Sequence, residues 1–220
     1  MTMQAPRAMA PTTMSGRTEE REHGELPGTE APWLVVGLGN PGPAYAGHRH
    51  NVGQRVVQEL RARDGGSLRT HSSRLAAVLE TRWSLAGSRV VLAIPTSYMN
   101  DSGGSVAALA RFYRVPADRL VVVHDELDIP FGAIRVKLGG GDNGHNGLRS
   151  VRARLGTGQF YRVRLGVGRP QGRVSPAAFV LSNYRASERD SVVAQVVRAA
   201  DAVESLAAEG LDRTQSEFNA

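Results

Sequence analysis

Three segments of the chain place amide and imidazole side chains where apolar runs end. Asn100 closes TSYMN, His124 and Asp125 lie in RLVVVHDEL, and His145 and Asn146 lie in the glycine-rich GGGDNGHNG. A histidine oriented by a carboxylate is the minimal general base for activating water, and amides beside it could hold a polar ester or amide. The chain has no cysteine and no G-x-S-x-G sequence. Direct attack by water is therefore favoured over a covalent nucleophile.

A fourth polar segment follows the apolar run WLVVGL, whose glycines satisfy G-x-G-x-x-G over residues 37–42. In a dinucleotide-binding loop the helix begins at the loop, and an acidic residue follows about 20 residues later. Here helical spacing begins only at Val52, and Glu59 lies inside that helical pattern. The dinucleotide hypothesis therefore fails. The run instead delivers Asn40 to a polar loop that also carries Tyr45, His48, His50 and Asn51.

A metal site is the main alternative use of these side chains. The potential zinc ligands are His48, His50, His124, Asp125 and His145. No H-E-x-x-H framework is present, and a metal site would leave the asparagines unexplained. We expect neither a metal ion nor another cofactor.

Charge and composition narrow the class of partner. The formal net charge is +6, and Asp142 is the single acidic residue between positions 135 and 173. The basic residues of that stretch are Arg135, Lys137, Arg149, Arg152, Arg154, Arg162, Arg164, Arg169 and Arg173. Such a stretch would attract nucleic acid, although a solvated basic face would have the same composition. No apolar run reaches the ~18 residues of a membrane span, and no secretory h-region precedes the fold. The absence of cysteine fits a reducing compartment, so we expect a cytoplasmic protein without a membrane partner.

The elements that must position the polar residues alternate along the chain. Residues 1–30 predict a disordered tail, and residues 31–215 predict one folded domain. Short apolar runs predict strands at 33–38, 75–83, 88–94, 119–127, 133–138 and 160–168. Helical spacing predicts helices over 52–63, 102–114 and 148–155. A capping-box pattern at Ser187 predicts the start of a long last helix, whose apolar face is Val193, Val196, Val197, Ala200, Val203 and Leu206.

Interleaved strands and helices without an internal repeat predict an α/β fold. We expect a single three-layer domain with a mixed, mostly parallel, twisted sheet and helices on both faces. Some antiparallel pairing is expected because the link from Asp125 to Arg135 is too short for a helical crossover.

Taken together, four motifs resemble one family. GLGNPGxxY…HN, SYMNDSG, HDELDIPFG and GGGDNGHNGL occur in this order, and the chain from about Trp33 to about residue 210 resembles bacterial-type peptidyl-tRNA hydrolases. The resemblance implies a monomeric enzyme that hydrolyses the ester between a peptide and the 3′ ribose of tRNA, so that the tRNA is reused in translation. It also implies that the protein binds the acceptor stem and 3′ end of peptidyl-tRNA.

The resemblance assigns roles by position. His50 matches the general base, Asp125 the carboxylate that orients it, and Asn40 the residue that separates N-blocked peptidyl-tRNA from free aminoacyl-tRNA. Asn100 and Asn146 match amides that bind the ester and the peptide end, and Asn100 is also a candidate for stabilising the oxyanion. The remaining implied contacts are Tyr45, Tyr98, Met99 and His145 to the substrate, and Lys137 and Arg164 to tRNA phosphates.

Two features leave alternatives open. Asn143 stands where many relatives have glycine, in a loop that acts as a gate in the family; asparagine tolerates the left-handed backbone conformation that such a position requires. A non-catalytic RNA-binding module, as in splicing-factor relatives of the same fold, is the rival function, and a metal-dependent hydrolase is a second. The intact set of Asn40, His50, Asn100, Asp125 and Asn146 favours the enzyme.

Overall fold

A seven-stranded mixed sheet forms the centre of the computed structural model, which describes Met1, residues 31–83 and residues 87–219. The predicted tail at residues 1–30 lies outside the described residues, apart from Met1. Residues from Ala31 onward belong to one compact unit. The strand order is β2-β3-β4-β1-β5-β7-β6. The strands are β1 (Trp33–Gly37), β2 (Arg69–Thr70), β3 (Ala76–Arg82), β4 (Arg89–Pro95), β5 (Leu120–Glu126), β6 (Ile134–Leu138) and β7 (Tyr161–Gly166).

Parallel pairing is confined to the four central strands. β1 pairs in parallel with β4 and β5, and β5 pairs in parallel with β7. The other three pairs, β2 with β3, β3 with β4 and β6 with β7, are antiparallel. The expected mixed α/β sheet is confirmed, and so is the antiparallel strand after the short link that follows Asp125. The expected parallel pairing holds for the four central strands, whereas the pairs at both edges of the sheet are antiparallel.

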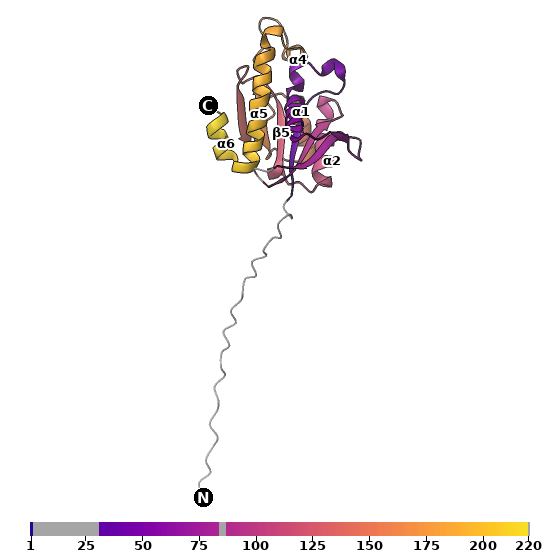
Figure 1. Cartoon of the computed structure of the whole chain (residues 1–220), viewed down its shortest axis with the longest axis vertical. Coiled ribbons are helices and arrows are strands. Elements are labelled where there is room, and N and C mark those ends of the chain that lie inside the picture. Colours follow the sequence, from indigo (N-terminus) through magenta and orange to yellow (C-terminus); the bar gives the residue numbers. More distant parts are fainter. Residues whose placement is uncertain (2–30, 84–86, 220) are drawn as a thin grey trace. The chain divides into compact units, whose positions relative to one another are not determined.

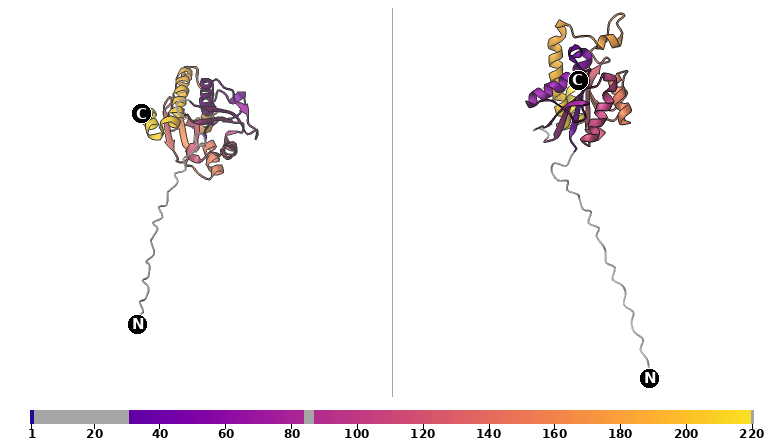
Figure 2. Two further views of the ribbon diagram at one scale, coloured as in Figure 1. Left: turned by 60° about the horizontal axis from the view of Figure 1, so that its bottom comes forward. Right: turned by 90° about the vertical axis from the view of Figure 1, so that its right-hand side faces the viewer.

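Helices cover both faces of this sheet. The first layer contains α1 (Val52–Asp64), α5 (Arg189–Glu209) and α6 (Leu211–Phe218), and the second contains α2 (Ser102–Phe112) and α3 (Asn146–Leu155). Figure 1 and the right-hand view of Figure 2 show the two layers on either side of the strands. In β1, Trp33 and Val35 face the first layer, whereas Leu34 and Val36 face the second. Burial on both faces explains why the central strands are continuously apolar.

The long last helix begins later than the sequence predicts. Its N-cap is Glu188 rather than Ser187, because Ala186–Glu188 form a short 3-10 helix of their own, in which the Glu188 carboxylate accepts a hydrogen bond from the backbone nitrogen of Arg185 (2.6 Å). The predicted apolar face is also wrong at two positions, since Val193 and Val197 are exposed. The buried residues of this helix are Val192, Gln195, Val196, Ala199, Ala200, Ala202, Val203 and Leu206, so the other four predicted positions are buried as expected.

Several short elements were not predicted. They are β2, α4 (Pro176–Val180), α6 and the 3-10 helices η1 (Pro43–Tyr45), η2 (Arg49–Asn51), η3 (Met99–Asp101), η4 (Ala117–Arg119) and η5 (Ala186–Glu188). Within the described part of the chain, no helix combines the length and the apolar character needed to cross a membrane.

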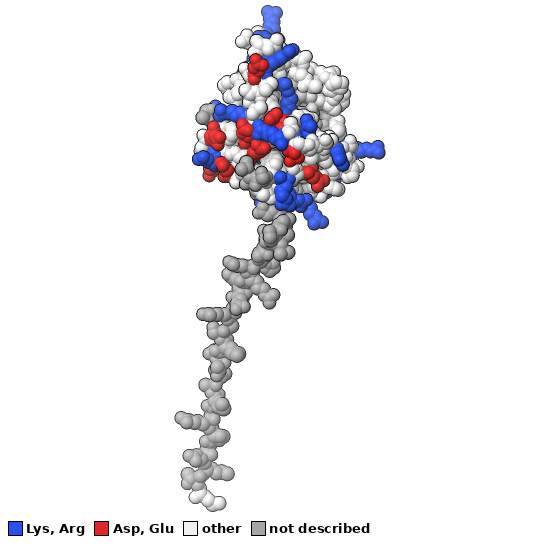
Figure 3. Space-filling view, in the orientation of Figure 1, with Lys and Arg blue, Asp and Glu red and all other residues white. Residues whose placement is uncertain are grey.

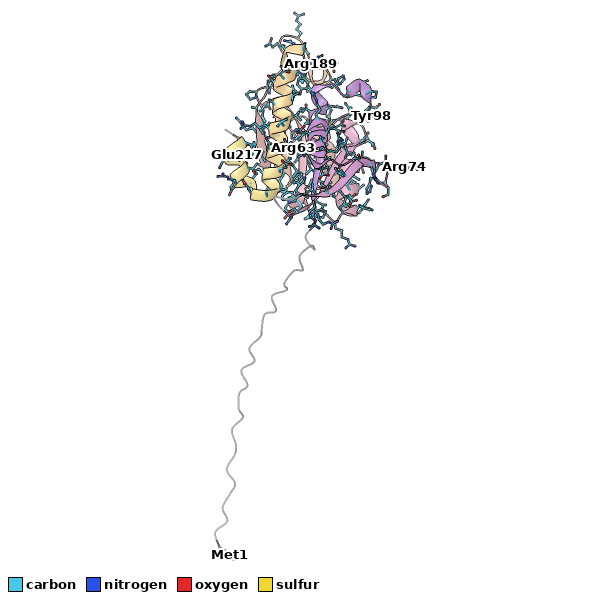
Figure 4. The ribbon with its side chains drawn as sticks, viewed as in Figure 1. Met1, Arg63, Arg74, Tyr98, Arg189 and Glu217 are labelled. Atoms are coloured by element: carbon cyan, nitrogen blue, oxygen red, sulfur yellow. The ribbon has the colours of Figure 1, made fainter. Side chains whose placement is uncertain are left out.

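Arg63 ties α1 to α5 at the surface of the first layer. Its guanidinium contacts Glu59 of α1 (3.0 Å) and Asp201 and Glu204 of α5 (both 2.8 Å). Figure 3 shows basic and acidic side chains intermixed over this face, and Figure 4 labels Arg63 between the two helices. This face is therefore charge-balanced, unlike the arginine-rich stretch at residues 135–173.

The beginning of α1 packs directly on the backbone of the central strands. A Cβ added to Gly53 would collide with the carbonyl oxygen of Val123 in β5, and it would lie 2.8 Å from the nitrogen of Leu38. A Cβ on Gly37 would in turn collide with the carbonyl of Gly53. Only glycine permits this approach, and His50 lies three residues before Gly53.

We predict that Gly53→Ala lowers the free energy of unfolding by about 1–3 kcal/mol, because an added methyl group in a packed interior forces backbone shifts. Chemical denaturation measures this change. The matched control is Gly104→Ala in α2, where an added Cβ meets nothing within 4 Å. Helix propensity alone then predicts unchanged or slightly higher stability. Equal stability of the two variants would contradict the packing argument.

Candidate active site

Polar side chains converge at the carboxyl ends of the parallel strands, where α/β proteins usually bind ligands. Asn40 follows β1, Tyr98 to Asn100 follow β4, and Asp125 lies near the end of β5. His145 is the N-cap of α3, and Asn146 is the first residue of that helix. These side chains and His50 line one cleft of about 650 Å³. The structure therefore brings together most of the predicted site residues.

The centre of the cleft is an imidazole–carboxylate pair. Nδ1 of His50 lies 2.8 Å from Oδ1 of Asp125, with side chains 11% and 3% exposed. Burial alone would raise the pKa of the Asp125 carboxyl. The electrostatic interactions and hydrogen bonds with His50 and His145 outweigh burial and hold that pKa well below its ordinary value. An ionised carboxylate accepts the Nδ1 proton, which leaves Nε2 as the basic nitrogen of neutral His50.

His145 is the second histidine on the same carboxylate oxygen. Its Nε2 lies 3.1 Å from Oδ1 of Asp125, and its Nδ1 accepts a hydrogen bond from the backbone nitrogen of Leu148 (3.2 Å). Because Nδ1 is an acceptor, Nε2 carries the proton and donates a hydrogen bond to Asp125. Both ring nitrogens of His145 are thus engaged, whereas His50 has one left for chemistry.

His124, the sequence neighbour of Asp125, does not join this pair. Consecutive side chains of a strand point to opposite faces, and His124 is buried, with Nδ1 2.7 Å from the backbone oxygen of Asp125. Burial, followed by repulsion from His145, lowers its pKa well below the ordinary value. The partner of Asp125 therefore comes from the loop before α1 and not from the adjacent position.

Asn40 and Asn51 bind the loop segments to each other. The backbone nitrogen of Asn40 donates to Oδ1 of Asn51 (2.9 Å), and Nδ2 of Asn51 donates to the carbonyl of Asn40 (2.8 Å). Oδ1 of Asn40 accepts from the backbone nitrogen of Met99 (2.8 Å). The Asn40 side chain thus fixes the loop after β4 and keeps its Nδ2 group for a ligand. Asn51 was not among the predicted site residues; its position beside His50 was the signal that could have identified it.

The remaining substrate candidates differ in exposure. Asn100 and Asn146 are exposed at the edge of the cleft, and Oδ1 of Asn146 accepts from Arg149 (3.3 Å). Tyr98 is 57% exposed, whereas Met99 is buried. Tyr45 does not line the cleft but packs edge-on against Tyr98, with ring centroids 6.2 Å apart.

Lys137 and Arg164 lie outside the cleft, on β6 and β7. Their neighbours Val136 and Val163 face the first helix layer, so alternation directs both cations to the face that carries α3. Burial and then repulsion from Arg164 and Arg162 lower the pKa of the Lys137 ammonium. Clustered cations that repel one another would be stabilised by an anion.

The glycine-rich loop over residues 139–147 is anchored at several points. Asn143 adopts the left-handed conformation (φ 48°), as its residue type allows, and its Nδ2 donates to the Glu126 carboxylate (3.0 Å). Arg162 donates to the carbonyl oxygens of Gly140 (2.6 Å) and Gly141. Glu126 and Arg162 are buried and were not predicted as site residues, because nothing in their types or spacing marks them.

A metal ion could bind where the hydrogen bonds of Asp125 meet. One ligand atom each from His50, Asp125 and His145 lies within 4.8 Å of the others. The two other histidines considered as ligands, His48 and His124, are not part of this group. An ion here would replace the hydrogen bonds that give His50 and His145 their different roles.

Comparisons with known proteins agree with this geometry. The family described as peptidyl-tRNA hydrolase matches residues 34–220. The peptidyl-tRNA hydrolase of Frankia casuarinae is 57% identical over 88% of this chain and 97% of its own length. That of Mycolicibacterium smegmatis is 57% identical over 86% and 98%. The crystal structure of peptidyl-tRNA hydrolase from Acinetobacter baumannii superposes with a TM-score of 0.80 at 33% identity, over 86% of this chain and 95% of the other. The chain belongs to the peptidyl-tRNA hydrolase family.

Proposed function

We propose that the protein hydrolyses the ester bond between a peptide, or an N-blocked amino acid, and the 3′ ribose of tRNA. The observation that carries this proposal is the 2.8 Å contact between His50 and Asp125 in a cleft that asparagine side chains also line. A general base in such a cleft can activate water, and amides can bind an ester without competing for the proton. Membership of the family supports the choice of substrate.

In the proposed reaction, the free Nε2 of His50 is the general base. Nε2 of His50 removes a proton from water while the water oxygen bonds to the ester carbonyl carbon. Asp125 stabilises the imidazolium, and the amide N–H of Asn100 stabilises the oxyanion. The bond from the carbonyl carbon to the ribose oxygen then breaks, and that oxygen takes the proton from His50. The products are tRNA and the peptide carboxylic acid, which loses its proton to solvent.

Asn40 supplies a basis for preferring N-blocked substrates. Its Oδ1 is held by Met99, so the group it presents to a ligand is the Nδ2 donor. The carbonyl of a blocking peptide bond can accept from that donor, whereas the ammonium of a free aminoacyl-tRNA has only donors. We therefore assign Asn40 to substrate selection.

The proposal includes a cytoplasmic, monomeric protein that requires no metal ion. Translation supplies the substrate in the cytoplasm, and His50, Asp125 and the amides complete the chemistry within one chain. A non-catalytic RNA-binding module is the rival function. It would bind tRNA without hydrolysing the ester.

We predict that His50→Ala lowers kcat on N-acetyl-aminoacyl-tRNA by about 10²–10⁴, the usual contribution of a positioned base. Release of the labelled amino acid measures the rate, and the fold is checked by thermal unfolding. A transition-metal chelator should leave the wild-type rate unchanged. Full turnover by His50→Ala would reject the assigned base, and loss of the wild-type rate with chelator would favour a metal-dependent hydrolase.

We predict that Asp125→Asn lowers kcat and moves the acidic limb of the kcat/KM profile to lower pH. The reason is that a neutral amide no longer stabilises the imidazolium of His50. The depressed pKa of Asp125 keeps the wild-type carboxylate ionised over the whole range of the assay. Rates measured from pH 5 to 9 test this, and a limb at the wild-type pH would refute the role of Asp125.

We predict that Lys137→Gln with Arg164→Gln raises KM for the tRNA ester and makes it less dependent on salt. Each lost phosphate contact should reduce the slope of log KM against log salt by about 0.7–0.9. The matched control is Arg69→Gln with Arg82→Gln, two exposed cations on β2 and β3 at the opposite edge of the sheet. Equal slopes for the two double variants would remove Lys137 and Arg164 from the tRNA surface.

A further inference from the structure

A second groove of about 640 Å³ adjoins the catalytic cleft between α2 and α3. Asn100 and Asn146 line both hollows, so the two meet at this pair of amides. This size falls in the range of ~300–1,000 Å³ that small-ligand sites usually have. The proposed reaction uses the amides but leaves the rest of the groove without a role.

The two hollows differ in chemistry. The cleft has an apolar wall that includes Leu127, Val180 and Leu181. The groove is lined by Ser97, Ser105 and Ser150, whose hydroxyl groups bond within the protein, and by Arg149 and Arg154. A peptide with varied side chains suits an apolar wall, whereas guanidinium groups suit phosphates and bases.

The charges of the groove favour an anion. Arg149 and Arg154 are both exposed, and Asp101 is the acidic residue of the lining. Among the described residues, no carboxylate lies within ion-pair distance of Arg154. Leu75, 39% exposed, offers an apolar contact for a base. Guanidinium groups bind phosphates and also stack on bases, which is how single-stranded nucleic acid is usually held.

We infer that this groove binds the unpaired nucleotides that precede the terminal adenosine of the tRNA 3′ end. This inference rests on the proposed function, because it needs the ester to lie at Asn100 and Asn146. From that point the peptide extends along the apolar wall of the cleft, and the nucleotide strand extends into the groove. Arg149 also donates to Asn146 (3.3 Å), so a phosphate bound to Arg149 stands next to an amide that holds the ester.

All tRNAs end in the same single-stranded CCA sequence, so one groove would serve every tRNA. Its contribution should therefore depend on the presence of these nucleotides and not on the tRNA body. The test compares three esters of the same N-acetyl amino acid, carried by adenosine, by the trinucleotide CpCpA and by full-length tRNA. The adenosine ester lacks both the penultimate nucleotides and their phosphates.

Two variants change the groove in different ways. Arg154→Glu reverses a charge, and Gly104→Leu adds volume at a groove position where an added Cβ meets nothing within 4 Å. We expect each to lower kcat/KM for the trinucleotide and tRNA esters by about tenfold, through KM, and to leave the adenosine ester unchanged. The matched control is Arg111→Glu, an exposed arginine of α2 that does not line the groove. It should leave all three esters unchanged.

Equal losses on all three esters, or none on any, would overturn the inference. A measurement of CpCpA binding distinguishes a failure of this inference from a failure of the proposed function. Chemical-shift changes on adding CpCpA, which has no ester to hydrolyse, should cover Ser97, Ser105 and Ser150 in the wild type and weaken about tenfold in Arg154→Glu. A wild-type chain that binds CpCpA in the groove but cleaves none of the esters would refute the enzyme and keep the nucleotide site. Binding elsewhere would refute the site.

Discussion

The contact between the start of α1 and the backbone of β5 is the constraint on which the site depends. Because Gly53 lies directly on the carbonyl of Val123, the helix begins against the strand with no side chain between them. His50 precedes this contact by three residues, and Asp125 follows it by two. Their side chains can therefore meet at 2.8 Å although 75 positions separate them in the chain. Gly37, the first glycine of the sequence that imitates a dinucleotide loop, is explained by this packing, whereas Gly42 is explained by its positive φ (98°).

Asp125 then distinguishes the two histidines that it contacts. Both rings approach Oδ1, but Nδ1 of His145 is occupied by the backbone of α3, whereas Nε2 of His50 faces the cleft. The carboxylate stays ionised because these two rings outweigh its burial. Asparagine amides line the same cleft, so the ester can be held by groups that do not take the proton. Asp125 and the backbone N–H of Leu148 thus set the two tautomers, and the tautomers determine which histidine can accept a proton.

The fold and the location of the site could largely be predicted from sequence, because apolar runs mark buried strands and polar residues mark their ends. Asn40, Asn100 and Asp125 follow this rule. The partner of Asp125 could not be derived from the residues alone, since four histidines were candidates and only tertiary packing selects His50; the family resemblance supplied it. Asn51, Glu126 and Arg162 act by holding backbone and loops, and no motif marks that role. The face of the last helix was misjudged because neighbouring valines fit two stripes, and Ala199 is a weak apolar signal.

The roles of His50 and His145 depend on which ring nitrogen of each histidine carries the proton. Long-range proton–nitrogen NMR of the nitrogen-labelled protein at neutral pH reads which ring nitrogen carries the proton, and single His→Gln variants assign the signals. We expect neutral His50 to carry its proton on Nδ1, with Nε2 free, and His145 to carry its proton on Nε2. A proton on Nε2 of neutral His50 would contradict this assignment, because that nitrogen could then not accept a proton from water.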